Sequence, residues 1–156
     1  MIVDWNRARQ AVDIAHVTGG NAVFTNGCFD ILHVGHVQYL EYARSLGDIL
    51  IVGVNSDDSV KRYKGKDRPI VPEHERCLML SGLRSVDQVV IFDEDEPKDL
   101  IRHILPDILV KGGDWAHYVS GREIVEENGG KVVLAEFIKG KSTTNIIEKI
   151  LETHEK

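Results

Sequence analysis

Two histidines, His33 and His36, combine a residue type and a spacing that can support chemistry. An apolar run at residues 22–24, typical of a buried strand, and a turn at Gly27 precede them, and a helical pattern starts around His33. Because they are three residues apart, both should lie on one face of the first helical turn, beside free backbone N–H groups and the positive end of the helix dipole. Such donors favour an oxyanion, most naturally a phosphate, and Gly35 has no side chain that would keep a phosphate away from the backbone.

Two other interpretations of the histidine pair stay open. Both imidazoles could bind a zinc ion, which would need further ligands, and Cys28 is the only soft candidate in this stretch. The pair could also be accidental in a chain with seven histidines. The coincidence of strand, glycine turn and helix start favours the phosphate site.

The composition is that of one soluble domain. The chain has 156 residues, 42% of them hydrophobic and 28% charged, which is enough for one core of ordinary size. No apolar run is long enough to span a membrane and the N-terminus lacks a signal segment, so we expect a cytoplasmic protein without membrane association. The net charge of −6 argues against a general nucleic-acid binder, and the two cysteines, Cys28 and Cys77, need not pair.

One compact basic segment stands out in this acidic chain. Lys61, Arg62, Lys64, Lys66 and Arg68 fall within eight residues. Basic residues gathered in this way indicate a small anionic ligand. A solvated basic loop explains the cluster equally well, so both interpretations stay open.

Strands alternate with helices along the chain, which requires right-handed crossovers and a parallel sheet. The first helix, with Asp4 as its N-cap, falls within residues 1–20 and should pack outside the sheet. We predict a single Rossmann-like α/β domain over residues 1–156, with a five-stranded parallel sheet and helices on both faces. Strands are expected at residues 22–24, 49–54, 88–92, 108–110 and 132–135, and the later helices at about 33–46, 72–83, 97–104, 122–128 and from 142 onward.

The polar segments that follow the strands should meet in one crevice. In an open parallel sheet, ligands bind at the carboxyl ends of the strands, near the point where the strand order reverses. Thr25–Phe29, Asn55–Asp57 and Lys111–Trp115 follow predicted strands, and residues 137–144 follow the last one. We therefore expect these segments to form a single site.

Taken singly, most of these residues are weak evidence. A Gly-Gly-Asp turn at residues 112–114 is usually only a tight turn, and Trp115 could be buried as readily as stacked on a ligand. Hydroxyls at a helix start, here Ser142–Thr144, are usually caps, although the same position can bind phosphates. Arg76 could form a surface ion pair.

The stretch Asn26-Gly-Cys-Phe-Asp-Ile-Leu-His-Val-Gly-His36 resembles the signature of the cytidylyltransferase-like nucleotidyltransferases, whose shared mark is H-x-G-H after the first strand. Among them, the chain most closely resembles the adenylyltransferase domain of the bacterial ADP-heptose synthases. The similarity runs in order over nearly the whole chain beyond about residue 20. It rests on five stretches, Thr25–His36, Asn55–Asp57, Lys64–Pro72, Lys111–Trp115 and Ser142–Ile147.

The resemblance implies roles for individual residues. His33 and His36 would contact the triphosphate and stabilise charge at the α-phosphorus, and Lys64 would be a mobile cation that closes over a phosphate. Nucleotide-binding positions would be Thr25, Asn26, Gly27, Cys28, Phe29, Gly35, Lys111, Gly113, Asp114, Trp115, Ser142, Thr143 and Thr144. Acceptor-binding positions would be Asp30, Asn55, Asp57, Lys66, Arg68 and Arg76. A structural role for Asp30, as a cap of its loop, is the alternative.

The implied reaction transfers AMP from ATP to D-glycero-β-D-manno-heptose 1-phosphate and gives ADP-heptose and pyrophosphate. Mg²⁺ would enter with the triphosphate and be held mainly by phosphate oxygens and water, since no carboxylate cage stands out. The resemblance also implies a homodimer, the default symmetric assembly. A chain of this length has no room for a sugar kinase, so we expect a separate kinase to supply the acceptor.

Three alternative functions stand beside this one. A CTP-dependent cytidylyltransferase acting on glycerol 3-phosphate or a similar ester is the nearest, although Phe137 stands where such relatives have an arginine. A non-catalytic nucleotide-binding module would bind ATP without releasing pyrophosphate, and the presence of both histidines argues against it. A Rossmann dehydrogenase is disfavoured because the first turn lacks G-x-G-x-x-G.

Overall fold

The computed structural model describes residues 1–113, 117–136 and 142–154. Its centre is one sheet of five parallel strands in the order β3-β2-β1-β4-β5, which confirms the predicted fold class. Among the described residues, no helix is both long and apolar enough to cross a membrane. The strands are β1 (Ala22–Gly27), β2 (Ile49–Asn55), β3 (Gln88–Phe92), β4 (Ile108–Gly112) and β5 (Lys131–Ala135).

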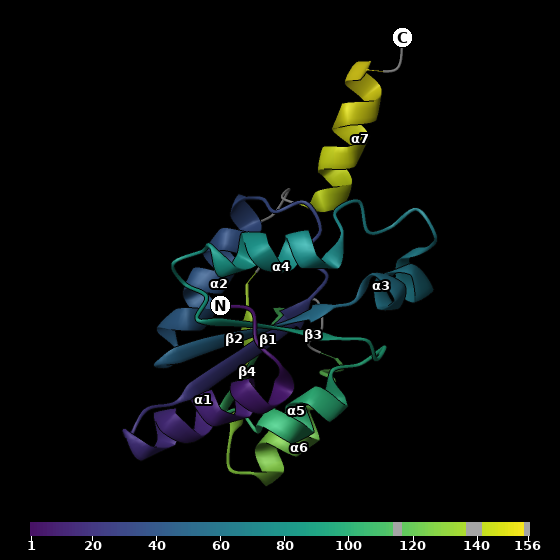
Figure 1. Cartoon of the computed structure of the whole chain (residues 1–156). Helices are drawn as coiled ribbons and strands as arrows, with labels where there is room; N and C mark the ends of the chain where they lie inside the picture. Colours follow the sequence, from purple (N-terminus) through teal and green to yellow (C-terminus); the bar gives the residue numbers. More distant parts are fainter. Residues whose placement is uncertain (114–116, 137–141, 155–156) are drawn as a thin grey trace.

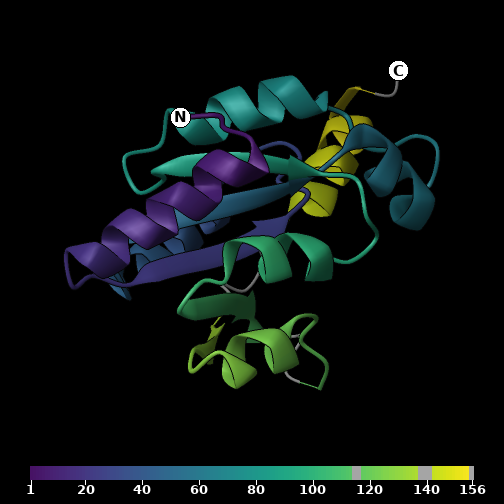
Figure 2. The ribbon, with the colours of Figure 1, turned by 60° about the horizontal axis from the view of Figure 1, so that its bottom comes forward.

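Helices cover both faces of the sheet (Figures 1 and 2). One face carries α1, α5 and α6, and the other carries α2 and α4, while α3 follows the end of β2 and α7 projects from the domain. The helices are α1 (Trp5–Val17), α2 (Val34–Ser45), α3 (Asp57–Lys64), α4 (Glu73–Ser81), α5 (Lys98–Ile104), α6 (Arg122–Glu127) and α7 (Thr143–His154).

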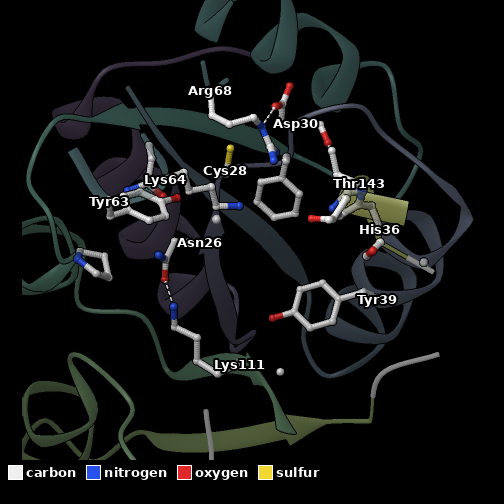
Figure 3. Close-up of a pocket in the computed structure, with 18 of the residues that line it drawn as sticks. Asn26, Cys28, Asp30, His36, Tyr39, Tyr63, Lys64, Arg68, Lys111 and Thr143 are labelled. Carbon is white, nitrogen blue, oxygen red and sulfur yellow. Dashed lines mark hydrogen bonds and ion pairs between the residues drawn. The ribbon is translucent and has the colours of Figure 1, made fainter. Parts of the chain in front are cut away.

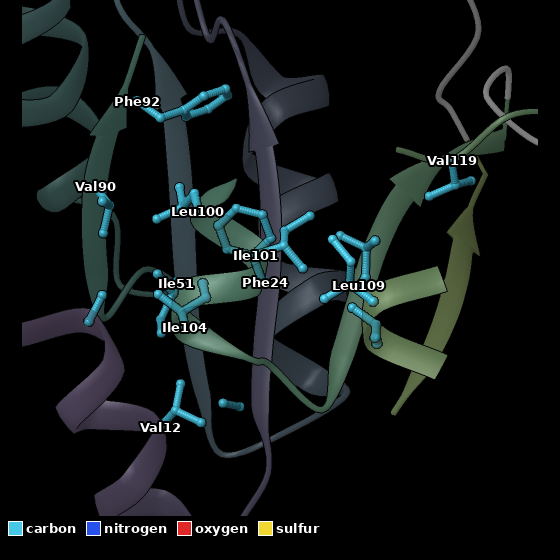
Figure 4. Close-up of a cluster of buried hydrophobic side chains, with 14 residues drawn as sticks. Val12, Phe24, Ile51, Val90, Phe92, Leu100, Ile101, Ile104, Leu109 and Val119 are labelled. Atoms are coloured by element: carbon cyan, nitrogen blue, oxygen red, sulfur yellow. The ribbon is translucent and has the colours of Figure 1, made fainter. Parts of the chain in front are cut away.

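Each face of the sheet packs its own apolar cluster because successive side chains of a strand point to opposite faces. On β1, Phe24 packs with α1, α5 and α6, whereas Val23 packs with α2 and α4. Figure 4 shows Phe24 among the side chains of neighbouring strands and of Ile101 and Ile104 on α5. Both clusters are buried, so the sheet is a rigid support for the residues at its carboxyl edge.

The elements were predicted well, with one omission. Asp4 caps α1 as expected, since its carboxylate accepts a hydrogen bond of 2.8 Å from the Arg7 amide. In contrast, no helix is predicted for the basic segment, yet most of it lies in helix α3. Ser56 caps this helix by accepting a 3.0 Å hydrogen bond from the Ser59 amide, and acidic residues occupy its first turn. A short helix with few apolar residues shows little periodic signal.

A gap in strand pairing opens the carboxyl edge of the sheet. β1 pairs with β2 over its whole length, but its pairing with β4 ends at Phe24 and Leu109. Beyond that point, the Val110 carbonyl oxygen lies 3.0 Å from the Thr25 hydroxyl and 3.2 Å from the Tyr39 hydroxyl, and the two hydroxyls are 2.7 Å apart. Side-chain hydrogen bonds thus take the place of backbone pairing between β1 and β4 at this point. The strand order reverses here, and ligands bind at such a point in this class of sheet.

Candidate functional site

A cleft of about 620 Å³ lies over the carboxyl ends of the strands. This is a typical size for a small-molecule site. Its walls come from segments far apart in the sequence, as Figure 3 shows for Asn26, Lys64, Lys111 and Thr143. The predicted residues that line it are Asn26, Gly27, Cys28, Phe29, Asp30, His33, Gly35, His36, Asn55, Lys64, Arg68, Lys111, Ser142, Thr143 and Thr144.

The two histidines cap helix α2 with their own rings. His33 Nδ1 accepts a hydrogen bond of 3.1 Å from the Gly35 amide, and His36 Nδ1 accepts one of 3.3 Å from the His33 amide. A neutral imidazole that accepts at Nδ1 carries its proton at Nε2. Both rings are therefore set as Nε2–H donors, which the sequence had left open. The expected free amides are partly used: the Gly35 amide binds the His33 ring and the His36 amide binds the His33 carbonyl.

The surroundings of His36 hold it in the neutral form. Burial, the adjacent His33 and the nearby Lys64 together lower the pKa of His36 to about 4. The two imidazoles are stacked, with ring centroids 3.9 Å apart, and the Phe29 ring lies 5.5 Å from that of His36. A neutral ring still donates a hydrogen bond to a phosphate oxygen through its Nε2–H.

The start of helix α7 lines the same cleft as the histidines, and Thr143 and His36 lie near one another in the view of Figure 3. The Ser142 hydroxyl oxygen accepts a 3.1 Å hydrogen bond from the Asn145 amide, so this residue caps the helix as predicted. The Thr143 hydroxyl donates to the Asp30 carbonyl oxygen. That hydrogen is unavailable to a ligand, so among the three predicted hydroxyls Ser142 and Thr144 are the better candidates for phosphate contacts.

Asp30 connects its own loop to residues 68–71 and to the start of α7 by hydrogen bonds. Its buried carboxylate accepts hydrogen bonds of 2.8 Å from the Ile70 amide, 2.9 Å from the Val71 amide and 2.8 Å from Arg68 Nε. Its backbone carbonyl oxygen accepts a hydrogen bond from the Thr143 hydroxyl. Burial alone would raise the pKa of Asp30, but these bonds together hold it below its usual value. Because both oxygens are engaged by the protein, the geometry favours the alternative role, that of a structural tie.

The loop between β1 and α2 contains two residues in the left-handed region of backbone conformation. Phe29 has φ +52° and Ile31 has φ +49°. Bulky and β-branched side chains rarely adopt such values, which cost on the order of 1–3 kcal/mol each and persist only where the surroundings impose them. The hydrogen bonds to Asp30 and to the Cys28 carbonyl supply that constraint. Nothing in the local sequence indicated this strain.

Arg76 lies beneath the cleft. Its side chain is 1% exposed, and its guanidinium donates to the carbonyls of Val71 (2.9 Å), Cys28 (2.6 Å) and Asn55 (2.9 Å) and to the Asp57 carboxylate (2.8 Å). Neither Arg76 nor Asp57 lines the cleft. Their predicted contact with the acceptor is therefore replaced by a buried ion pair that ties the end of β2 to the loop after β1.

The basic segment divides between the cleft and the surface. Lys64 and Arg68 line the cleft, whereas Lys61 pairs with Asp58 on the helix surface. Arg62 forms an ion pair of 2.7 Å with Asp95, and Lys66 is exposed and does not line the cleft. Two of the five cations, Lys64 and Arg68, therefore lie where the predicted anionic ligand would bind.

Residues at the ends of β1 and β4 meet in the cleft. Lys111 Nζ donates a hydrogen bond to the Asn26 side-chain oxygen, as Figure 3 shows. Thr25 is fully buried and Gly113 is exposed, and neither lines the cleft. Asp114 and Trp115, like the Phe137 position, lie outside the described residues, and their roles remain predictions.

Cys28 faces the cleft as a buried thiol. Burial raises the pKa of Cys28 above its ordinary value, although Lys64 and Arg76 act in the opposite direction. The nucleophilic form of cysteine is the thiolate, so a raised pKa disfavours covalent chemistry at this position. Cys28 can therefore occupy its predicted place in the nucleotide site as a packing residue and not as a nucleophile.

Several lining residues were not predicted. Tyr39 and Tyr63 lie on helices, where sequence patterns favour packing over ligand binding, and Pro97 is the N-cap residue of α5. Asp95 and Glu96 follow β3, and Tyr118 and Ser120 follow β4. The rule that ligands collect at carboxyl ends of strands could have flagged the last four, since they follow predicted strands.

Comparison with known proteins agrees with this geometry. The family model described as cytidylyltransferase-like matches residues 24–149. The bifunctional protein HldE of Syntrophotalea carbinolica is 52% identical over 148 residues, which cover 94% of this chain and 30% of that protein. HldE of Geotalea uraniireducens is 59% identical over 133 residues, which cover 85% of this chain and 27% of that protein. The chain thus spans less than a third of the length of these relatives.

Two solved structures share the fold. The lipopolysaccharide core biosynthesis protein from Thermoplasma volcanium is 32% identical, with a TM-score of 0.63, and the match covers 79% of this chain and all of that one. Pantothenate synthetase from Thermus thermophilus has the same TM-score at 16% identity, and the match covers 93% of this chain and 66% of that one, a likeness of fold alone. By its family model, its similar relatives and its H-x-G-H site, this chain belongs to the cytidylyltransferase-like family.

Proposed function

We propose that this cleft transfers the adenylyl group of ATP to the phosphate of D-glycero-β-D-manno-heptose 1-phosphate and releases pyrophosphate. The observation that carries the proposal is the pair of imidazoles of His33 and His36, whose Nδ1 atoms accept backbone hydrogen bonds, so that each ring presents Nε2 as a donor in the cleft that the start of α7 also lines. The heptose acceptor is supported by the resemblance to ADP-heptose synthases and by the name of the Thermoplasma protein, which refers to lipopolysaccharide core biosynthesis.

The arrangement suits phosphoryl chemistry, in which the protein positions groups and neutralises charge. An acceptor phosphate oxygen attacks the α-phosphorus, and pyrophosphate leaves from the opposite side. His33 and His36 donate to oxygens that gain negative charge, and their fixed tautomers require no rearrangement as that charge develops. Lys64 and Arg68, which also line the cleft, add positive charge.

Mg²⁺ belongs to the proposal as a companion of ATP. The described residues include no group of three or more His, Cys, Asp or Glu that could hold a metal ion. Mg²⁺ keeps several waters and binds substrate phosphates readily, so phosphate oxygens would be its main ligands here. When bound, it would supply charge neutralisation on the triphosphate.

The proposal includes two partners, a sugar kinase that acts earlier and a second copy of this chain. The acceptor carries a phosphate ester, so a sugar kinase reaction must precede this one. A homodimer stays a prediction from symmetry, and light scattering of the purified protein tests it directly.

A screen of nucleotides and acceptors tests the function. Purified protein is incubated with ATP or CTP and with a panel of phosphate esters, and pyrophosphate and product mass are measured. We expect pyrophosphate only with ATP and a sugar 1-phosphate. CTP with glycerol 3-phosphate as the preferred pair would establish the cytidylyltransferase alternative, and ATP binding without pyrophosphate would establish a non-catalytic module.

Replacing one histidine tests the observation on which the proposal rests. His36→Ala should lower turnover by about 100-fold or more, as for the loss of a transition-state donor. The surface variant His154→Ala, at the far end of α7, is the control and should keep wild-type turnover. Near-normal turnover of the His36 variant, with its fold intact by circular dichroism, would refute this role.

A further inference from the structure

The cleft has a second wall that the proposed chemistry does not use. It is formed by Asp95 and Glu96, from the loop after β3, and by Tyr118 and Ser120, from the segment after β4. We call these four residues the acidic wall. They lie across the strand ends from the histidines, because the two segments lead into α5 and α6, on the opposite face of the sheet from α2.

One hydroxyl in this wall, that of Ser120, is left unpaired within the part of the chain that the structure describes. The residue is 9% exposed, and among the described residues its hydroxyl has no hydrogen-bond partner. Buried polar groups in native proteins are nearly always paired, so each exception asks for an explanation. Since Ser120 lines the cleft, a bound molecule is the natural source of the missing hydrogen bond.

Hydrogen bonds hold the rest of the wall in place. Glu96 accepts a 2.8 Å hydrogen bond from the Tyr118 hydroxyl and lies 3.5 Å from Lys98 Nζ. Asp95 accepts a 2.7 Å hydrogen bond from Arg62 Nε on α3. The loop after β3 and the segment after β4 are thus joined directly, which makes the wall pre-organised.

The charge of the wall selects the kind of group that it accepts. Because Asp95 pairs with Arg62 and Glu96 with Lys98, the wall has no excess positive charge to attract a phosphate, whereas the rest of the cleft carries His33, His36, Lys64 and Arg68. Carboxylate oxygens accept hydrogen bonds, and a serine hydroxyl can both donate and accept. A neutral group with several hydroxyls satisfies all of these atoms, whereas a nucleotide phosphate does not.

We propose that the acidic wall binds the hydroxyl groups of the acceptor sugar. This inference rests on the proposed nucleotidyl transfer and deepens it, because it assigns the sugar to one side of the cleft. In an in-line displacement the acceptor enters opposite to the departing pyrophosphate. With the triphosphate at the histidines and at the start of α7, the acceptor enters from the side of the acidic wall. The ribose of ATP is the other neutral group with several hydroxyls that this wall could bind, and the experiment below distinguishes it from the acceptor sugar.

Ser120→Ala is the sharpest variant because it removes a hydroxyl that bonds to no described protein group. Its thermal stability should equal or exceed that of the wild type. The KM for the sugar 1-phosphate should rise about threefold to tenfold, the effect of one lost hydrogen bond, while the KM for ATP stays within about twofold. Glu96→Gln should act in the same direction. Ser45→Ala, on the exposed end of α2, is the matched control and should change neither constant.

Kinetics and binding together separate the outcomes. If the wild type transfers AMP but Ser120→Ala raises only the KM for ATP, or neither constant, the acidic wall does not hold the sugar and the proposed function stands. If the wild type releases no pyrophosphate, calorimetry with a sugar 1-phosphate and a non-hydrolysable ATP analogue shows whether the acidic wall still binds the sugar. Binding of the sugar 1-phosphate that weakens in Ser120→Ala supports the wall and overturns the transfer, and absence of binding, or binding unchanged in the variant, overturns both.

Discussion

Replacement of Arg76 by methionine should destabilise the fold strongly without weakening the affinity for the acceptor, because we assign substrate recognition to other residues. Methionine is close to arginine in length but has no hydrogen-bond donor in its side chain. The variant orphans the carbonyls that Arg76 now satisfies and leaves the Asp57 carboxylate without its buried partner. Breaking a buried ion pair by removing one partner costs about 3–5 kcal/mol. Each orphaned carbonyl adds at most about 1–3 kcal/mol, less where water reaches it. Because Asp57 is itself partly exposed and can be solvated in the variant, we expect a net loss of about 3–5 kcal/mol.

Urea unfolding followed by circular dichroism measures this loss. With a slope of about 1–3 kcal/mol per molar urea, the midpoint should fall by about 1–5 M. Arg102→Met is the matched control, because Arg102 forms an exposed ion pair with Asp99 on α5 and should change stability by less than about 0.5 kcal/mol. Arg76→Lys, which keeps the charge but not the planar fork, should fall between the two.

One outcome would overturn this account of Arg76. If Arg76→Met unfolded at the wild-type urea concentration but lost affinity for the acceptor, Arg76 would be a substrate contact, as the sequence had suggested. Measuring the KM of the acceptor well below the unfolding temperature of each variant keeps the two effects apart.

The site supports three further predictions. Because the pKa of His36 is lowered to about 4 from an ordinary 6.5, its neutral form stabilises the fold fully above pH 6.5. That stability, about 1–3 kcal/mol after allowance for partial exposure, should be lost as the pH falls from about 6.5 to 4, and urea unfolding of His36→Gln should show a flatter pH profile. Asp30→Asn should cost about 2–4 kcal/mol and speed proteolysis within residues 65–72, as a buried ion pair and a hydrogen bond to an amide are lost. Thr143→Val should lower stability by about 1 kcal/mol but leave the Kd for ATP unchanged, because the Thr143 hydroxyl hydrogen is already donated to Asp30; weaker ATP binding in titration calorimetry would contradict this.

Local patterns predicted most of the fold. Apolar runs such as Ile49–Val54 have the length and continuity of buried parallel strands, and the strand–helix alternation left one topology class. The ends of these strands then indicated that His33, Lys111 and Ser142 share one cleft, as they do. Short-range chemistry explains this success, since a cap, a turn and a hydrophobic period each depend on residues within a few positions.

The α/β class, the place of the cleft and the family signature can therefore be deduced from the order of residues alone. Which polar residues face the cleft and which support it becomes visible only in the assembled domain. Arg76 and Ser120 illustrate the difference: nothing in the neighbouring sequence says that the guanidinium is buried among carbonyls or that the hydroxyl has no partner among the described residues. Satisfaction of a polar group depends on partners far away in the chain, and Arg76 and Cys28, 48 residues apart, meet only because the sheet brings their segments together.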